Sequence, residues 1–420
     1  MLPKIVSFLK SWRGSGFAAF LLARLMGMFA TQIQAVVVGY QVYELTHSAL
    51  ALAWVGLAQF IPMLLLLMLA GDLIDRYARK PILMASWGIA TVCGLALWWL
   101  SGHGSAGVSG IYATLVLFGC SRAFSGPALQ SLLPQIVPRE KLAQAIATNG
   151  MVMRAASIGG PLVGGLIYAW GGGKWTYSIC AFCFLAGTLL LIRVKLRPTP
   201  ANGTATSGGT MLQRFATGIR FIFSRPIILG SISLDLFAVL LGGVVALLPI
   251  YAHDILHVGA DGLGLLRSAI AIGEVGAGFF LSLWPFDRAV GKKLFIAVIV
   301  FGLANLTFSL SQWFWLSFAT LMIAGAADMV SVYVRSALVQ FSTPDDMRGR
   351  VSAVNMLFIS SSNELGEFRA GLSAEYFGPV AAALFGGLCT LGVVGLWFRL
   401  FPTLFSVNKF AEAEENVTAR

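Results

Sequence analysis

The sequence predicts an all-α integral membrane protein with twelve transmembrane helices in two pseudo-symmetric six-helix bundles and both termini in the cytoplasm. Three observations lead to this prediction: the apolar composition, long apolar runs of nearly constant length, and basic residues that collect between alternate runs. Hydrophobic residues make up 57% of the 420 positions and charged residues only 11%. A soluble core cannot bury that much apolar surface, so lipid must be the solvent for most of this chain.

Apolar runs of about 20 residues mark the expected helices, because this is the helix length that crosses the hydrocarbon core of a bilayer. The first six are predicted at 17–45, 50–70, 81–100, 109–133, 142–170 and 176–194. The second six are predicted at 227–252, 262–284, 294–309, 314–341, 351–377 and 380–400.

Lysine and arginine residues determine the predicted orientation. If the N-terminus is cytoplasmic, the cytoplasmic segments hold 22 of the 29 basic residues. The outside loops then hold two, Lys174 and Arg267, and the other five lie within helices. Short loops rich in lysine and arginine stay in the cytoplasm, which favours this topology over the inverted one.

The chain divides into two similar halves around a polar linker. We predict a cytoplasmic N-terminal segment (1–16), a first bundle (17–194), a linker (195–226), a second bundle (227–402) and a cytoplasmic tail (403–420). The stretch 198–210 is rich in Pro, Gly and Thr and is typical of a flexible connection. An offset of 206 positions relates Pro138, Ala147, Asn149, Gly160 and Gly165 to Pro344, Ala353, Asn355, Gly366 and Gly371.

Several functional classes lack support in the sequence. There is no G-x-x-x-x-G-K-[ST] loop, so transport would draw on an ion gradient or on the gradient of the substrate itself. No Ser/His/Asp or Cys/His set converges, which argues against an enzyme, and no cofactor is expected.

The net charge of +11 is explained by basic cytoplasmic loops rather than by nucleic-acid binding. His253, Asp254 and His257 could hold a metal, but a solvated loop end explains them as well, and we predict no metal site.

A cluster of charges interrupts the apolar runs between the second and third expected helices. The segment 71–80 carries two acids and three bases, which must lie at a membrane surface. Its pattern, G-x-L-x-D-R-x-x-R-K, resembles the corresponding loop of major facilitator superfamily transporters. That resemblance implies a gating latch made of Gly71, Asp72, Asp75, Arg76, Arg79 and Lys80, with an eroded copy at Asp287 and Arg288. A basic loop that only sets topology is the alternative for Arg79 and Lys80.

Other segments resemble the enterobactin-exporter-like branch of this superfamily. They are residues 41–46, 57–62, 122–128, 328–336, 343–355 and 362–368. The fifth expected helix adds the small-residue pattern of exporting branches, with Gly160, Pro161, Gly164 and Gly165. In the family this region is associated with antiport, although ordinary close packing of helices also favours small residues. The chain departs from its relatives at Arg369-Ala370, where they tend to have another acid and a serine.

Charged and polar residues at membrane depth are the candidate site residues, because each needs a partner, a wet cavity or a protonation event. The resemblance to the major facilitator superfamily implies that helices one, four, seven and ten line a central cavity. The expected substrate contacts are Arg24, Gln32, Gln34, Tyr40, Gln41, Arg122 and Arg335. The expected proton carriers are Asp235 and Asp328, followed by Glu274, Glu364 and Glu367. The alternatives are static ion pairs, such as Arg122 with Asp328, and hydrogen bonds between helices.

Together these features predict a bacterial inner-membrane exporter that exchanges protons for a small, amphipathic, anionic metabolite such as a siderophore. It would work by alternating access, as a monomer, with substrate, protons and lipid as its partners. A broad-specificity multidrug efflux pump is the first alternative, and a non-transporting membrane sensor is a remote one.

Overall fold

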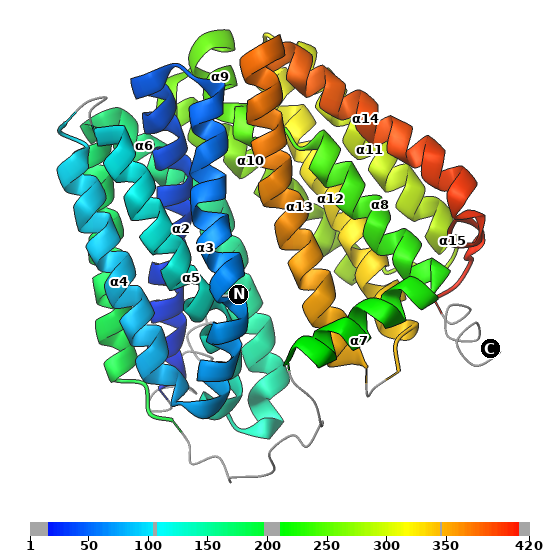
Figure 1. Cartoon of the computed structure of the whole chain (residues 1–420), viewed down its shortest axis with the longest axis horizontal. Helices are drawn as coiled ribbons and strands as arrows, with labels where there is room; N and C mark the ends of the chain where they lie inside the picture. The colour runs from blue at the N-terminus through cyan, green and yellow to red at the C-terminus, as the bar shows by residue number, and fades with distance from the viewer. Residues whose placement is uncertain (1–15, 104–106, 197–210, 345–346, 411–420) are drawn as a thin grey trace. The chain divides into compact units, whose positions relative to one another are not determined.

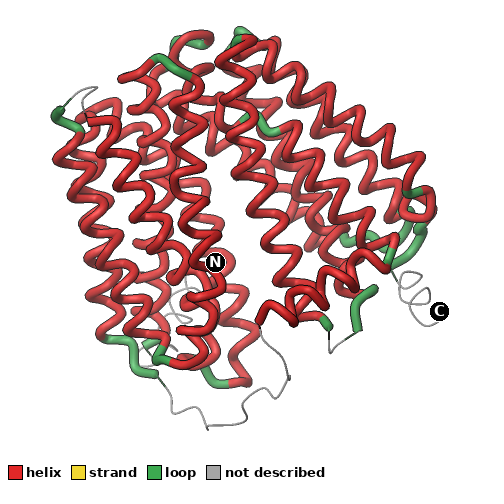
Figure 2. Tube along the Cα trace, in the orientation of Figure 1, coloured by secondary structure: helices red, strands yellow, loops and turns green. Residues whose placement is uncertain are grey.

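The computed structural model describes residues 16–103, 107–196, 211–344 and 347–410, which form helices and no strand (Figures 1 and 2). The flexible stretch predicted at 198–210 lies outside the described residues, as do residues 1–15 and 411–420. Ten of the described helices are long and apolar enough to cross a membrane. The all-helical, multi-pass architecture expected from the composition is therefore confirmed.

Five long helices make up the first half of the chain. They are α2 (Phe17–Thr46), α3 (Ala49–Arg76), α4 (Arg79–Leu100), α5 (Val108–Ile136) and α6 (Leu142–Ile192). α6 is 51 residues long and contains the span predicted at 142–170 and all but the last two residues of the span predicted at 176–194. The two parts are separated at Gly172, whose backbone has φ 67° and ψ −170°. A glycine adopts this conformation without the steric cost that a side chain would add.

The second half contains five long helices and a further, broken one. The long helices are α10 (Gly259–Leu283), α11 (Val290–Leu310), α12 (Phe314–Phe341), α13 (Arg348–Phe377) and α14 (Pro379–Leu400). α13 is 30 residues long, but it is too polar to count among the ten apolar helices. The short α15 (Pro402–Ser406) follows α14.

The helix predicted at 227–252 is broken in the structure. α8 (Pro226–Gly242) ends at two glycines and is followed by short turns at Val245–Leu247 (η3) and Leu248–Ile250 (α9), and by a π-helical turn at Tyr251–Ile255 (η4). A Cβ atom on Gly242 would lie 2.0 Å from Thr390 Oγ1, so a larger residue would require the Thr390 side chain to move. The break frees backbone carbonyls, which need polar partners inside a membrane. Asn305 Nδ2 donates to Gly242 O at 3.2 Å, and an Arg369 guanidinium nitrogen lies 3.5 Å from Gly243 O.

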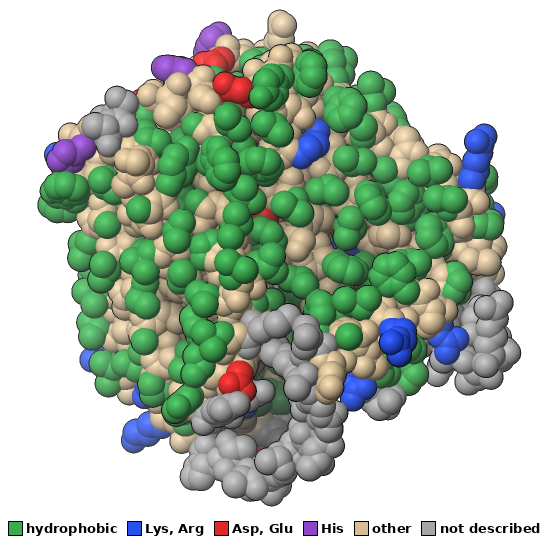
Figure 3. All heavy atoms as spheres, in the orientation of Figure 1, with side chains coloured by type: hydrophobic (Ala, Val, Ile, Leu, Met, Phe, Trp, Pro, Cys, Tyr) green, Lys and Arg blue, Asp and Glu red, His purple; other side chains and the backbone are tan. Residues whose placement is uncertain are grey.

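One helix of the predicted linker had not been expected. Residues Met211–Ser224 form α7, an amphipathic helix that packs against α8 and α13. Its Ile222 is fully buried in a hydrophobic cluster with Ile228, Val351 and Val354. Figure 3 shows several Lys and Arg side chains near α7 and hydrophobic side chains over most of the visible faces of the helices.

The described residues form two compact units. The first takes in the described parts of Met1–His47, Trp54–Thr206 and Gly259–Gly264, and the second those of Ser48–Ala53, Ser207–Val258 and Leu265–Arg420. The first unit thus includes the first turn of α10, and the second includes the first turn of α3. Each unit is described below by itself.

Candidate functional site: buried polar groups of the two units

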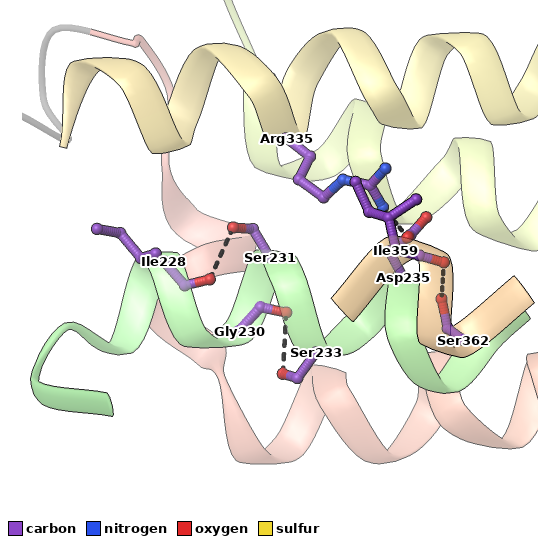
Figure 4. Close-up of polar contacts among 8 residues, drawn as sticks. All are labelled: Ile228, Gly230, Ser231, Ser233, Asp235, Arg335, Ile359 and Ser362. Carbon is purple, nitrogen blue, oxygen red and sulfur yellow. Dashed lines mark hydrogen bonds and ion pairs between the residues drawn. The ribbon is translucent and has the colours of Figure 1, made fainter. Parts of the chain in front are cut away.

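The clearest buried charge pair lies in the second unit, between α8 and α12. Asp235 and Arg335 form an ion pair and point toward one another in Figure 4. Their side chains are almost completely enclosed, because Asp235 is 7% exposed and Arg335 is 3% exposed. Two opposite charges held this close neutralise each other in a place where either charge alone would be strongly unfavourable. Both residues could be identified as candidates from the sequence, but their pairing could not.

A small cavity brings the second predicted proton carrier to the same place. Asp328, one helical turn before Ser331 on α12, lines this cavity together with Asp235. The cavity measures about 10 Å³, which is near the lower limit for a single water molecule. Ser331 is 4% exposed, and its hydroxyl has no hydrogen-bond partner among the described residues. Two acids and a buried serine therefore line, together with apolar side chains, a space about the size of one water.

The remaining predicted acids lie on other helices of this unit. Glu364 and Glu367 on α13 interact electrostatically with Arg267, and all three are half-buried. Arg267 lies inside α10, in agreement with the helix predicted at 262–284, so its assignment to an outside loop in the count of basic residues is wrong. The helix begins at Gly259, three residues earlier than the apolar run indicates, because polar residues such as Asp261 occupy its first turn. Glu274, also on α10, is half-buried.

Arg369 on α13 is a functional candidate that the sequence analysis does not include among the site residues. Its Nε and one terminal nitrogen are buried without a hydrogen-bond partner in the described part of the chain. Its other terminal nitrogen faces the carbonyl of Gly243 at the break after α8. The signal in the sequence is a cation at membrane depth.

The first unit holds the two predicted substrate-binding arginines. Arg24 on α2 is 6% exposed, and its guanidinium lies 3.1 Å from Met153 Sδ on α6. Its Nε has no hydrogen-bond partner in the described ranges. Arg122 on α5 is half-buried and lies 3.5 Å from Gln59 Oε1 on α3. Neither arginine forms an ion pair with an acid among the described residues of this unit, so both stay candidates for contact with an anion.

Some polar side chains of α2 have hydrogen-bond or ring partners within the unit, and others lack a hydrogen-bond partner among the described residues. Gln41 accepts a hydrogen bond of 2.6 Å from the hydroxyl of Tyr177, which is the helix-to-helix role left open above. Tyr40 packs edge-to-face on Tyr168, with ring centroids 5.5 Å apart. Gln34 is 2% exposed, and both atoms of its amide lack a partner in the described part of the chain. A buried amide without partners is costly, so Gln34 is the residue of α2 that most needs a bound water or substrate.

The small residues of α6 allow very close packing. Gly160 and Pro161 are buried, as are Gly164 and Gly165. A Cβ atom on Gly160 would lie 2.5 Å from Gln32 Cβ, and one on Gly165 would lie 2.3 Å from Ala260 O. Gln32 is half-buried beside this contact. These positions are tightly packed in the structure, and the role of α6 in export stays a prediction.

We expect Gly165→Val to destabilise the protein by about 1–3 kcal/mol, because a side chain there would collide with backbone atoms that cannot move independently. Gly150→Val is the matched control on the same helix, since a Cβ at Gly150 meets no atom within 4 Å. Thermal unfolding of the purified variants measures the difference. Equal unfolding temperatures for the two variants would contradict the close packing.

The predicted latch lies at the end of α3 and the start of α4. Arg79 donates to the backbone carbonyl of Ser131 at 3.0 Å, and Lys80 donates to the carbonyls of Ile192 and Val194 at 3.0 and 2.9 Å. These partners are backbone carbonyls near the ends of α5 and α6, where cations are favourable. Gly71 is half-buried and Asp72 exposed on α3, and Asp287 and Arg288 are exposed between α10 and α11. The side chains of Asp75 and Arg76 lie outside the described part.

The sequence matches a family model over residues 7–416, and this family is described as transmembrane secretion effector. The enterobactin exporter EntS of Escherichia coli O1:K1 is 27% identical over 410 residues, which cover 96% of this chain and 95% of the relative. The enterobactin exporter EntS of Citrobacter koseri is 28% identical over 391 residues, which cover 91% of each chain.

Solved structures have the same fold. A bacterial homologue of the iron transporter ferroportin, in an inward-facing state, aligns with a TM-score of 0.70 and 17% identity over 93% of this chain and 99% of that one. The inward-open xylose transporter XylE of E. coli aligns with a TM-score of 0.70 and 12% identity over 96% and 99% of the two chains. The family and these relatives are transporters and not enzymes. The chain therefore belongs to the transmembrane secretion effector family of the major facilitator superfamily of membrane transporters.

Proposed function

We propose that this protein is a proton-coupled exporter of a small anionic metabolite of the siderophore class. It would reside in the bacterial inner membrane with both termini in the cytoplasm. Its twelve spans would be the ten apolar helices, with α6 counted as two around Gly172 and with α13 added. The two bundles would correspond to 17–194 and 227–402, and alternating access would expose the substrate site to one side at a time.

One observation supports proton coupling above all: Asp235 and Asp328 line the same cavity, beside the buried Arg335. The ion pair neutralises the first carboxylate, so protonation of the second changes the net charge of the cluster by one unit. A change of charge in a buried place alters the relative free energies of two conformations, and a proton can therefore drive one toward the other. Asp328 is the proton carrier in this proposal, and Asp235 keeps Arg335 neutralised.

An anionic substrate is supported by the cations of the first unit. Arg24 is buried and Arg122 half-buried, and neither forms an ion pair within the described part of the chain, while the Gln34 amide can donate and accept hydrogen bonds. Among anionic metabolites we favour a siderophore, because relatives of this chain are named enterobactin exporters. The monomer is sufficient for this mechanism, because all the residues it uses belong to one chain.

Reconstituted transport tests the proposal directly. Liposomes with an acidic lumen, containing the purified protein, should take up enterobactin through the molecules inserted inside-out. Collapse of the pH gradient with a protonophore should reduce uptake to the level of protein-free liposomes. Uptake that persists without the gradient would refute proton coupling. Competition by unrelated lipophilic cations would instead support a multidrug pump.

We expect Ser331→Ala to slow proton-driven transport about fivefold, because the hydroxyl is available to hold a water between the two carboxyl groups, and one hydrogen bond contributes about 1 kcal/mol. Ser331→Thr keeps the hydroxyl and should retain most of the rate. Ser362→Ala is the control, since that buried hydroxyl already donates to Ile359 O at 2.9 Å (Figure 4). The initial rate of uptake against pH measures all three. A normal rate for Ser331→Ala would remove Ser331 from the proton path.

A further inference from the structure

A large groove on the second unit belongs to none of the sites described above. It has a volume of about 890 Å³ and lies between α11, α14 and α15. Most of its lining is apolar, with Phe295, Ile296, Ile299, Leu396 and Phe398 among the contributing side chains. Two cations, Lys292 and Arg399, complete it.

Both cations lie at the same end of the groove. Lys292 is in the first turn of α11, and Arg399 is in the last turn of α14. The amide of Gly291 donates to Val407 O at 2.9 Å, which joins the start of α11 to the segment that follows α14 and α15. The Lys292 ammonium also lies 6.0 Å from the ring centroid of Phe405 on α15. The groove is therefore amphipathic, with positive charge at one end and apolar side chains along its length.

The apolar part of the groove is open and exposed. Ile296 is 57% exposed and Leu396 is 50% exposed, so these side chains would face acyl chains in a bilayer. Gly395 forms part of the wall, and a Cβ atom there would meet no atom within 4 Å. Because Gly395 has no side chain, the wall of the groove is open at this position of α14.

We propose that this groove binds an anionic phospholipid of the surrounding membrane, with its phosphate at Lys292 and Arg399 and an acyl chain along Ile296, Ile299 and Gly395. Charge complementarity selects an acidic head group, and the apolar length selects a lipid over a free phosphate. A cytoplasmic leaflet location follows from the expected topology, in which the start of α11 and the end of α14 are cytoplasmic.

Native mass spectrometry of the full-length protein in detergent tests this proposal, with phosphatidylglycerol and phosphatidylcholine as the probes. The wild type should bind phosphatidylglycerol in preference to phosphatidylcholine. Lys292→Gln combined with Arg399→Gln should weaken phosphatidylglycerol binding about 30-fold, since each cation near an anionic lipid contributes about fivefold. Gly395→Leu should weaken the binding of both lipids, because the added side chain would occupy part of the groove.

Matched controls separate the groove from general effects. Lys293→Gln removes a neighbouring charge that lies 3.8 Å from the ring centroid of Phe286 and does not line the groove. Gly392→Leu adds the same side chain to α14 at another open position outside the lining. Both should bind phosphatidylglycerol as the wild type does. Equal binding of the two lipids by the wild type, an unchanged preference in the double variant, or displacement by millimolar glycerol 3-phosphate would each overturn the proposal.

Discussion

Replacement of Asp235 with Ala is expected to destabilise the folded protein by about 3–5 kcal/mol, because it leaves the Arg335 guanidinium buried without its counter-charge. Arg335 is only 3% exposed and cannot turn to water without displacing its neighbours on α8 and α12. The purified variant should unfold at a markedly lower temperature than the wild type. Poor recovery of folded protein from membranes would be the same effect in a stronger form.

A double variant separates the cost of an unpaired charge from the value of the pair itself. Asp235→Ala with Arg335→Met removes both charges and replaces the arginine with an unbranched apolar side chain. Replacing a buried ion pair in this way is often neutral or stabilising, so most of the lost stability should return. A single Asp235 variant as stable as the wild type, or a double variant as unstable as the single one, would contradict the buried pair.

Asp328→Asn should abolish pH-driven transport while the protein remains folded. Asparagine keeps the size and polarity of the side chain but cannot carry a proton, so the cluster with Asp235 and Arg335 no longer changes its charge. Enterobactin uptake into liposomes with an acidic lumen should fall to the level seen after the gradient is collapsed. The unfolding temperature should change little, since Asp328 is half-buried and its replacement is nearly isosteric.

Asp261→Asn is the control for this experiment. Asp261 is an exposed acid in the first turn of α10, away from the cavity, and its variant should transport normally. Retention of full pH dependence by Asp328→Asn would remove this residue from the coupling mechanism. The acids of α13 beside Arg267 would then be the next to test.

Helix positions could be predicted well because each span depends on a local property, the length of an apolar run. The run at 314–341 coincides with α12, and the run at 17–45 ends one residue before α2 does. Errors occur where polarity and packing oppose this rule. α3 continues past the predicted end at 70 to Arg76, and the helix expected at 227–252 breaks after Gly242 where it packs against Thr390.

The amphipathic helix α7 shows a different failure. Its apolar positions Phe215, Ile219 and Ile222 have helical spacing, but the adjoining Gly- and Pro-rich stretch led us to treat the whole of 195–226 as a linker. The periodicity was available in the sequence, while the partners on α8 and α13 were not.

Candidate site residues could be identified from the sequence, but their pairing could not. The cost of charge in a membrane singles out Asp235, Asp328 and Arg335 wherever they lie. Only the packing of α8 against α12 shows that Asp235 neutralises Arg335 and that Asp328 shares its cavity. Contacts between residues 100 positions apart depend on tertiary structure and leave no local trace in one sequence.

The central claim is that this protein exports a metal-chelating metabolite, and comparative mass spectrometry of iron-starved cultures tests it most directly. Medium and cell extracts from the wild-type strain would be compared with those from a strain that lacks the gene, and with a strain complemented by the intact gene. We predict that one metal-chelating compound disappears from the medium of the deletion strain, accumulates inside the cells and returns to the medium on complementation. The same compounds in the same amounts in all three media would contradict the claim.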